Sequence, residues 1–170
     1  EEIISSDIGN NCAIGNAYPT FDEGRRYLAP GLFGPCGYGL PSVVGAKIAC
    51  PDTPVVGFSG DGAFGIAVTE LTAIGRKEWP AITMVVFRNY QWGAEKRNST
   101  LWYDDNFVGT ELDTDVSYAG IAKACGLQGV QARTMDELTA ALRKAVDDQM
   151  NHGKTTLIET FLREVDDSVA

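Results

Sequence analysis

The fold is decided by residues 60–93, which read GDGAFGIAVTELTAIGRKEWPAITMVVFRNYQWG. The preceding run, Pro54–Phe58, is short, apolar and β-rich, which is typical of a buried strand. It ends in Gly60-Asp61-Gly62, after which Ala63–Gly75 predicts a helix and Ile82–Phe87 a second buried strand. Strand, helix and strand in this order predict a βαβ unit with parallel strands. The turns after the two strands therefore meet at one edge of the sheet, where open α/β sheets bind ligands.

The residues of these turns suit a phosphate group that is bound through a cation. Gly60 and Gly62 let the backbone approach a ligand closely, and a helix start at Ala63 offers free N–H groups to phosphate. Asp61 is an anion at the same place, which makes sense where a cation bridges it to the phosphate. Asn89 supplies a second oxygen from the end of the neighbouring strand. Oxygen ligation with few protein donors suits Mg²⁺ completed by phosphate oxygens and water.

This constellation resembles the signature of thiamine-diphosphate-dependent enzymes, in which Gly-Asp-Gly is followed, one βαβ unit later, by Asn-Asn. The resemblance implies that Asp61, Asn89 and the backbone carbonyl of Gln91 hold Mg²⁺ on the cofactor's diphosphate. The cofactor contacts implied in this stretch are Gly60, Asp61, Gly62, Ala63, Asn89, Gln91, Trp92 and Gly93. Arg88 stands where the first Asn of the signature is usual. Because that Asn is not normally a ligand, the departure concerns local hydrogen bonding and not the metal.

Two earlier segments are further candidates for the cofactor site. Asn10 and Asn11 follow a predicted first strand at Ile3–Ser6, and the resemblance implies that this turn touches the diphosphate. A helix-capping role for either asparagine is equally open, and the two roles are compatible. The second segment, residues 34–39, matches the loop that lies under the cofactor's pyrimidine ring in this family, which implies contacts from Gly34, Pro35 and Cys36.

Cys36 is smaller than the Met, Ile or Leu that is common at its place in the resembling family, which predicts a weaker wedge against the cofactor. From the residue alone we interpret Cys36 as a small buried hydrophobe in preference to a nucleophile. The four cysteines, at 12, 36, 50 and 125, form no CxxC pair and show no zinc spacing. They predict reduced thiols in a cytoplasmic protein.

The composition predicts one globular domain over residues 1–170. The chain has 170 residues, of which 44% are hydrophobic, and this is enough for a real core. A net charge of −9 argues against binding of nucleic acid, because no basic stripe neutralises phosphates. The longest apolar runs are strand-sized, so we expect no membrane association. The fold class predicted is α/β: a doubly wound, mainly parallel sheet of five or six strands with helices on both faces.

The remaining segments complete this expectation. The elements predicted are an irregular loop from Tyr27 closed by a helix start at Pro41, a helix over Tyr118–Cys125, a strand around Val130, a helix over Met135–Met150, a last strand over Thr155–Phe161, and a polar tail at residues 163–170. Residues 90–110 predict a long functional or mobile loop. Its Lys96 and Arg97, with Arg88 before them, are candidates for an anionic substrate, and plain solvation is the alternative. His152 lies in a polar turn and is not expected to be catalytic.

Residues 33–38, 89–96 and 107–112 are also similar to one acyltransferase subfamily of these enzymes, which implies thiamine-diphosphate-dependent acyl transfer involving a small-molecule substrate and phosphate. The alternatives are an acetohydroxyacid-synthase-like or 2-oxo-acid-decarboxylase activity, or a non-catalytic nucleotide-binding module. The last is disfavoured for NAD, because no Gly-x-Gly-x-x-Gly opens a helix after the first strand.

The resemblance also implies that part of the catalytic machinery lies outside this chain. In the family an activating glutamate comes from a separate pyrimidine-binding domain of the same or a neighbouring subunit, and 170 residues leave no room for that domain. We therefore expect the chain to be the diphosphate-binding domain, a fragment or C-terminal domain of a longer enzyme, without turnover of its own. Apolar surface around Phe33, Tyr38 and Trp92 is expected to favour association, as a homodimer or homotetramer.

Overall fold

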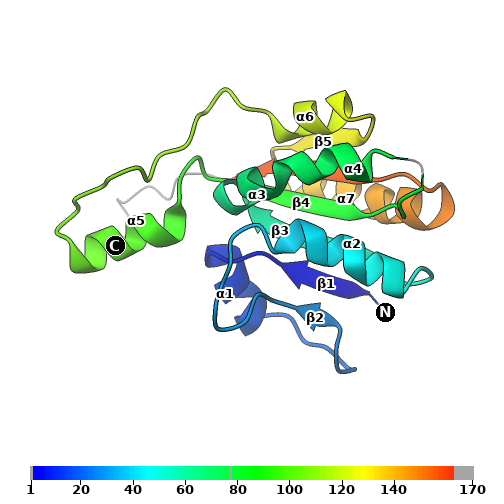
Figure 1. Cartoon of the computed structure of the whole chain (residues 1–170), viewed down its shortest axis with the longest axis horizontal. Helices are drawn as coiled ribbons and strands as arrows, with labels where there is room; N and C mark the ends of the chain where they lie inside the picture. Colours follow the sequence, from blue (N-terminus) through cyan, green and yellow to red (C-terminus); the bar gives the residue numbers. More distant parts are fainter. Residues whose placement is uncertain (1, 77, 163–170) are drawn as a thin grey trace.

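The fold is a parallel sheet covered by helices on both faces (Figure 1). The structure is a computed structural model that describes residues 2–76 and 78–162, so the predicted tail at 163–170 lies outside the described residues. The strands are β1 (Ile3–Ser6), β2 (Tyr27–Leu28), β3 (Val55–Gly60), β4 (Thr83–Arg88), β5 (Gln128–Ala132) and β6 (Thr156–Phe161), in the order β2-β1-β3-β4-β6-β5. Every neighbouring pair among them is parallel, which confirms the predicted fold class.

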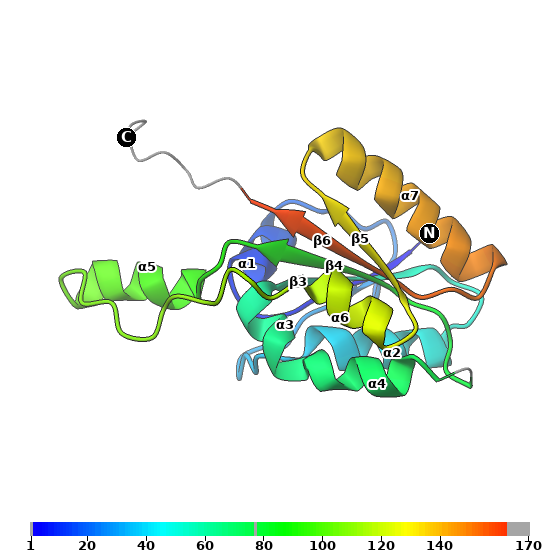
Figure 2. The same ribbon diagram turned by 90° about the horizontal axis from the view of Figure 1, so that it is seen from above.

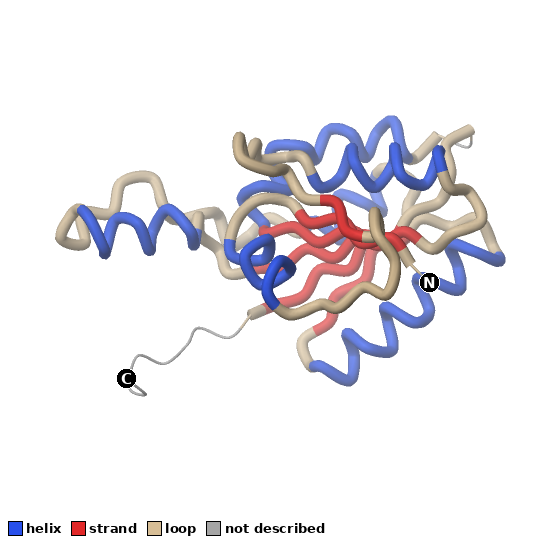
Figure 3. Tube along the Cα trace, turned by 90° about the horizontal axis from the view of Figure 1, so that it is seen from below, coloured by secondary structure: helices blue, strands red, loops and turns tan. Residues whose placement is uncertain are grey.

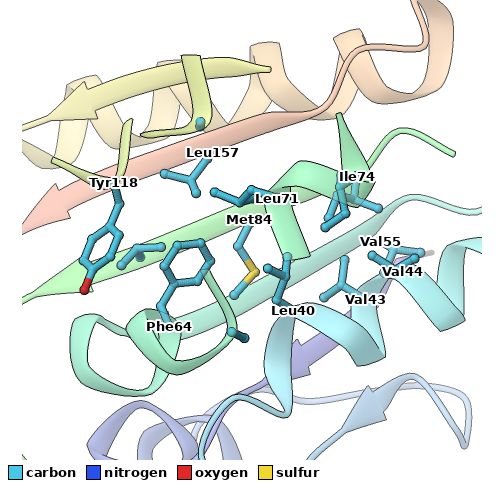
Figure 4. Close-up of a cluster of buried hydrophobic side chains, with 14 of the residues drawn as sticks. Leu40, Val43, Val44, Val55, Phe64, Leu71, Ile74, Met84, Tyr118 and Leu157 are labelled. Carbon is cyan, nitrogen blue, oxygen red and sulfur yellow. The ribbon is translucent and has the colours of Figure 1, made fainter. Parts of the chain in front are cut away.

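Helices lie in two layers, one on each face of the sheet (Figure 2). One layer holds α2 (Gly39–Ala49), α3 (Asp61–Ala67), α4 (Leu71–Ile74) and α6 (Tyr118–Ala124), and the other holds α1 (Asn10–Ala17) and α7 (Met135–Asn151). The larger core lies under the first layer, where Leu40, Phe64, Leu71, Met84 and Leu157 are almost completely buried (Figure 4). Each such side chain stabilises the fold by about 1.5–3 kcal/mol relative to an exposed one.

The strand order creates a crevice at the edge predicted to bind ligand. From β1 the chain passes to β2 on one side and then crosses to β3 on the other, so the strand order reverses between β1 and β3. Ligands of open parallel sheets bind at such a reversal, beyond the carboxyl ends of the strands. Asp7 follows β1 and Asp61 follows β3, so two acidic residues flank the crevice.

Several boundaries differ from the predicted ones for local reasons. The helix predicted from Ala63 begins at Asp61, and a 3₁₀ turn at Val68–Glu70 separates α3 from α4. The β-branched pair Val68-Thr69, which fits a helix less well, coincides with this break. Helix α2 begins at Gly39 and not at Pro41. The short strand β2 lies inside the segment predicted to be an irregular loop.

The segment predicted as a long loop contains a helix, α5 (Gly93–Trp102), so that prediction was wrong over these residues. Helix α5 extends away from the sheet and the chain returns beside it (Figures 1 and 3). The base of the excursion is closed by backbone hydrogen bonds, from Trp92 N to Thr110 O and from Leu112 N to Tyr90 O, each 2.8 Å long. No residue of α5 is buried, which explains why the helix leaves no apolar periodicity in the sequence.

Among the described residues, no helix combines the length and apolar character needed to cross a bilayer.

Candidate functional site

The carboxyl edge of the sheet contains a cavity of about 450 Å³. Of the residues predicted to bind the cofactor, those that line it are Asn10, Asn11, Gly34, Cys36, Gly60, Asp61, Gly62, Ala63, Asn89, Gln91, Trp92 and Gly93. Pro35 is exposed and does not line the cavity. The structure therefore brings together four segments that are far apart in the sequence.

Three oxygen-bearing groups converge at the point where a metal ion is expected. The Asn89 amide atom that faces this point lies 2.9 Å from the carbonyl oxygen of Gln91 and 3.0 Å from Oδ1 of Asp61. If this atom is the amide nitrogen, it donates a hydrogen bond to each of the two oxygens. If it is the amide oxygen, three hydrogen-bond acceptors face one another with no donor between them. Acceptors about 3 Å apart match the edge of an octahedron whose metal–oxygen bonds are about 2.0–2.1 Å long. This donor set fits Mg²⁺.

Asp61 is buried, with 1% of its surface exposed, and is the first residue of α3. Its Oδ2 accepts a hydrogen bond of 2.8 Å from the N–H of Tyr90, and its Oδ1 accepts one of 3.1 Å from its neighbour Gly62. Burial raises the pKa of Asp61 above its ordinary value, against the opposing effects of the Tyr90 N–H and the Arg88 guanidinium. A bound cation would favour the ionised carboxylate in the same way as these donors do.

Two glycines at the site are required by close contacts. A methyl group at Gly62 would lie 2.8 Å from the indole ring of Trp92, and one at Gly93 would lie 2.7 Å from Nδ2 of Asn89. Both distances are shorter than the separation of atoms in van der Waals contact. Gly62 and Gly93 therefore allow Trp92 and Asn89 to reach their places in the cavity wall.

A second buried carboxylate, Asp7, fixes the loop predicted to lie under a pyrimidine ring. Its Oδ1 accepts hydrogen bonds from the backbone N–H of Ile8 (2.9 Å) and of Gly37 (3.0 Å), and its Oδ2 accepts one from Gly39 (2.9 Å). The hydroxyl of Ser59, 3.3 Å away, also donates to Oδ2. Sequence reasoning did not single out Asp7, because its partners Gly37 and Gly39 are 30 and 32 residues away.

Two predictions about side chains at this edge were wrong. Cys36, predicted to be buried, is exposed and lines the cavity, because the left-handed backbone of Gly34 and Gly37 turns the loop outward at this point. Desolvation and the carboxylates of Asp7 and Glu95 raise the pKa of the Cys36 thiol. A protonated thiol is a weak nucleophile, which agrees with the interpretation that Cys36 is not catalytic.

Capping of α1 by an asparagine side chain, an alternative that the sequence left open, is the other expectation that the structure contradicts. Gly9 is the N-cap residue and no side chain caps the helix, since Asn10 and Asn11 are already helical. The Nδ2 of Asn11 instead donates to Oγ of Ser6 (3.0 Å) and to the carbonyl of Asp7 (2.9 Å). Both asparagines line the cavity, so their proposed contact with a diphosphate is unaffected.

The basic residues considered for an anionic substrate lie in different environments. Arg88 is 2% exposed and lies between two carboxylates, so it cannot reach a substrate in the cavity. Lys96 pairs with Glu111 at 2.7 Å, whereas Arg97 is exposed on α5. His152 lies 3.5 Å from Asp147 at the end of α7, outside the cavity lining. All four cysteines are free.

Sequence reasoning missed the apolar wall of the cavity. Ile14, Phe58, Phe87 and Leu162 line it beside the polar residues. Phe58 and Phe87 have ring centroids 5.8 Å apart and come from the neighbouring strands β3 and β4. In the sequence they are ordinary strand residues, and only the alternation of side chains along each strand could have placed both on one face.

Residues 7–160 match the family model described as thiamine pyrophosphate enzyme, C-terminal TPP binding domain. The chain belongs to this family. The match begins directly after β1, ends within β6 and includes Asp61, Asn89 and Gln91, so it agrees with the geometry of the cavity. Membership favours cofactor binding over the alternative of a nucleotide-binding module.

Curated relatives of this TPP-binding domain extend the comparison. The chain is 82% identical over 164 residues to the sulfoacetaldehyde acetyltransferases of Rhodobacter capsulatus and of Roseovarius nubinhibens, in each case over 96% of its own length. It spans only 28% and 27% of those two proteins. It is 26% identical over 164 residues, 96% of its length, to the acetolactate synthase isozyme 2 large subunit of Escherichia coli, of which it spans 29%.

Substitution of Asp7 by asparagine tests whether this carboxylate fixes the loop over the cavity. An amide can accept fewer of the three backbone N–H bonds, and a hydrogen bond to a charged group contributes about 1.5–3 kcal/mol. We expect Asp7→Asn to lower the free energy of unfolding of the full-length protein by about that amount, measured by urea denaturation, and to speed proteolysis within residues 34–39. Asp22→Asn, at an exposed aspartate, is the control. An unchanged proteolysis rate at this loop would contradict the role.

Proposed function

We propose that this chain is the thiamine-diphosphate and Mg²⁺ binding domain of a longer enzyme that acts as a sulfoacetaldehyde acetyltransferase. The complete enzyme would convert sulfoacetaldehyde and phosphate into acetyl phosphate and sulfite. The observation that carries the proposal is 82% identity to two proteins of that name over 96% of the chain, against 26% for an acetolactate synthase. The difference supports the first activity over the acetohydroxyacid-synthase-like alternative.

The residues of the cavity divide into groups by what each would hold. Oδ1 of Asp61, the amide oxygen of Asn89 and the carbonyl of Gln91 would hold Mg²⁺, with the remaining ligands from diphosphate and water. We assign Asn10, Asn11, Gly60, Gly62, Ala63, Trp92 and Gly93 to the diphosphate and Gly34 and Cys36 to the pyrimidine ring, with Pro35 beside them outside the cavity lining. When bound, the cofactor would supply carbanion stabilisation for cleavage of the substrate.

The chain's own contribution to the reaction is to bind, orient and exclude water. The hydrogen bonds that Asp7 accepts from Gly37 and Gly39 fix the loop that would lie under the pyrimidine ring. The wall containing Phe58 and Phe87 keeps water from one side of the cavity. For the phosphate, helix α5 offers Lys96 and Arg97, of which Lys96 is already paired with Glu111.

The activating acid of the family would come from a pyrimidine-binding domain of the same or a neighbouring subunit, in a cytoplasmic homodimer or homotetramer. Large apolar side chains exposed at this edge support such a contact. Leu32 and Phe33 are fully or almost fully exposed in the loop before the cavity, and Trp102 is 76% exposed at the end of α5. Covering exposed apolar surface of this kind favours association.

The cofactor assignment predicts that Mg²⁺ and thiamine diphosphate together stabilise the full-length protein. Ligand at about 100 times its Kd stabilises the folded state by about 2.7 kcal/mol, which raises Tm. We expect Asp61→Ala to abolish this rise in a thermal shift assay, because the alanine removes an oxygen from the metal site. Asp22→Ala, at an exposed aspartate, should keep the whole rise. Identical Tm values with and without both ligands, in active wild-type protein, would refute cofactor binding.

The substrate assignment predicts the products of a second assay. The full-length enzyme is given sulfoacetaldehyde or pyruvate, each with and without phosphate, and sulfite, acetyl phosphate and acetolactate are measured. We expect sulfite and acetyl phosphate from sulfoacetaldehyde only when phosphate is present, because phosphate is the proposed acyl acceptor. Acetolactate from pyruvate, with no sulfite from sulfoacetaldehyde, would replace the proposed activity by that of an acetohydroxyacid synthase and leave cofactor binding intact.

A further inference from the structure

Arg88 is a buried cation held between two buried carboxylates. It ends β4, and its Nη1 lies 2.5 Å from Oε1 of Glu159 while its Nε lies 3.4 Å from Oδ2 of Asp61. The side chains of all three residues are at most 2% exposed. Burial of a charge is unfavourable unless the charge is paired. The arrangement therefore compensates the charge of Arg88, whose Nε pairs with Asp61 by charge and not by a hydrogen bond, and it places a cation on one side of the proposed metal ligand.

The two oxygens of Asp61 have separate partners. Oδ2 accepts the N–H of Tyr90 at 2.8 Å and faces Nε of Arg88, so it is directed into the protein. Oδ1 lies 3.0 Å from the amide of Asn89, on the side where the carbonyl of Gln91 also points. Only Oδ1 is therefore directed to the metal position. Tyr90 has a φ of 60°, a left-handed backbone that is uncommon for a tyrosine and turns its N–H toward Asp61.

Arg88 is itself held from several directions, so it provides a rigid contact. Its guanidinium donates to the carbonyls of Val116 (2.5 Å) and Asp113 (3.3 Å), and it lies over the rings of Tyr90 and Tyr118, at 4.6 and 5.0 Å from their centroids. A lysine has no planar fork and could not make these contacts while also facing Asp61.

Glu159 fixes the far side of the guanidinium. Besides Arg88 it accepts hydrogen bonds from Oγ of Ser117 (3.0 Å), Nε2 of Gln131 (3.1 Å), and the N–H groups of Tyr118 and Ala119 (3.2 Å each). Glu159 also balances the charge of Arg88. The charges of Asp61, Arg88 and Glu159 therefore sum to one negative charge, which would attract a cation bound at Oδ1 of Asp61.

We propose that Arg88, anchored by Glu159, is a positioning residue that restricts Asp61 to binding metal through one oxygen, and that it thereby makes the site selective for Mg²⁺ over Ca²⁺. The inference rests on the proposed function in that it takes Asp61 as a metal ligand. Mg²⁺ requires near-octahedral geometry with single oxygens, whereas Ca²⁺ takes more ligands and accepts carboxylates through both oxygens. With Oδ2 occupied by Arg88 and Tyr90, two-oxygen binding by Asp61 is blocked.

The test measures metal affinity separately from activity. Mn²⁺ binding to the full-length protein with thiamine diphosphate is followed by the electron paramagnetic resonance signal of free Mn²⁺, and Mg²⁺ and Ca²⁺ then displace it in competition. Arg88→Lys removes the contact to Oδ2, and Glu159→Gln releases the anchor of Arg88 while preserving shape. Asp22→Asn is the control, because Asp22 is an exposed aspartate outside the cavity lining.

We expect both test variants to bind Mg²⁺ about 10- to 100-fold more weakly, the usual effect of changing a residue that supports a metal ligand. We also expect their preference to shift from Mg²⁺ toward Ca²⁺, because Oδ2 of Asp61 is then restrained only by the N–H of Tyr90 and turns more easily to the metal. The control should keep the wild-type affinity and preference. A lost ion pair that matters only for folding would change stability without changing the ratio of Mg²⁺ to Ca²⁺ affinity, so an unchanged ratio in either folded variant overturns the inference.

The outcomes separate this inference from the proposed function. If Mn²⁺ binds Asp61→Ala as well as wild type, or does not bind wild type, the metal site itself is misplaced and both ideas fail. If Asp61→Ala abolishes binding while Arg88→Lys and Glu159→Gln bind and select metals as wild type does, only the role of Arg88 is refuted. Should Arg88→Lys fail to fold, Glu159→Gln answers the same question.

Discussion

A carboxylate at the buried end of a strand must be compensated by donors or by a cation, and the structure depends on how this is done at Asp61. The N–H of Tyr90 and the guanidinium of Arg88 compensate one oxygen from inside the protein. The other oxygen is directed outward, where it meets the amide of Asn89. Arg88 ends β4 and Tyr90 follows it, whereas Asp61 follows β3. The way in which β4 packs beside β3 therefore determines which oxygen of Asp61 points into the cavity.

A buried carboxylate that accepts backbone N–H groups follows each of the two strands that flank the reversal of strand order. Asp7 after β1 accepts N–H groups from the loop before α2, and Asp61 after β3 accepts one from the end of β4. Each buried acid holds a segment that is distant in sequence against the carboxyl edge of the sheet. The two segments that they hold line a cavity that suits a cofactor with a diphosphate at one end and a ring at the other.

Sequence reasoning could predict those features that depend on local pattern. The Gly60-Asp61-Gly62 turn, the strands around it and the position of Asn89 follow from short motifs and apolar runs, and these residues do meet in the cavity. The Arg88–Glu159 pair could not be predicted, because its members are 71 residues apart and neither shows a local signal. Helix α5 buries none of its residues, and the exposure of Cys36 depends on the turns of its loop, so neither feature has an apolar pattern to reveal it.

The most direct test of the account is a crystal structure of the full-length protein with Mg²⁺ and thiamine diphosphate bound. We expect an ion with bonds of about 2.0–2.1 Å to Oδ1 of Asp61, to the amide oxygen of Asn89 and to the carbonyl of Gln91, completed by diphosphate oxygens. Oδ2 of Asp61 should remain on Tyr90 and Arg88. An ion that leaves these three oxygens uncoordinated, or a diphosphate bound outside this cavity, would contradict it.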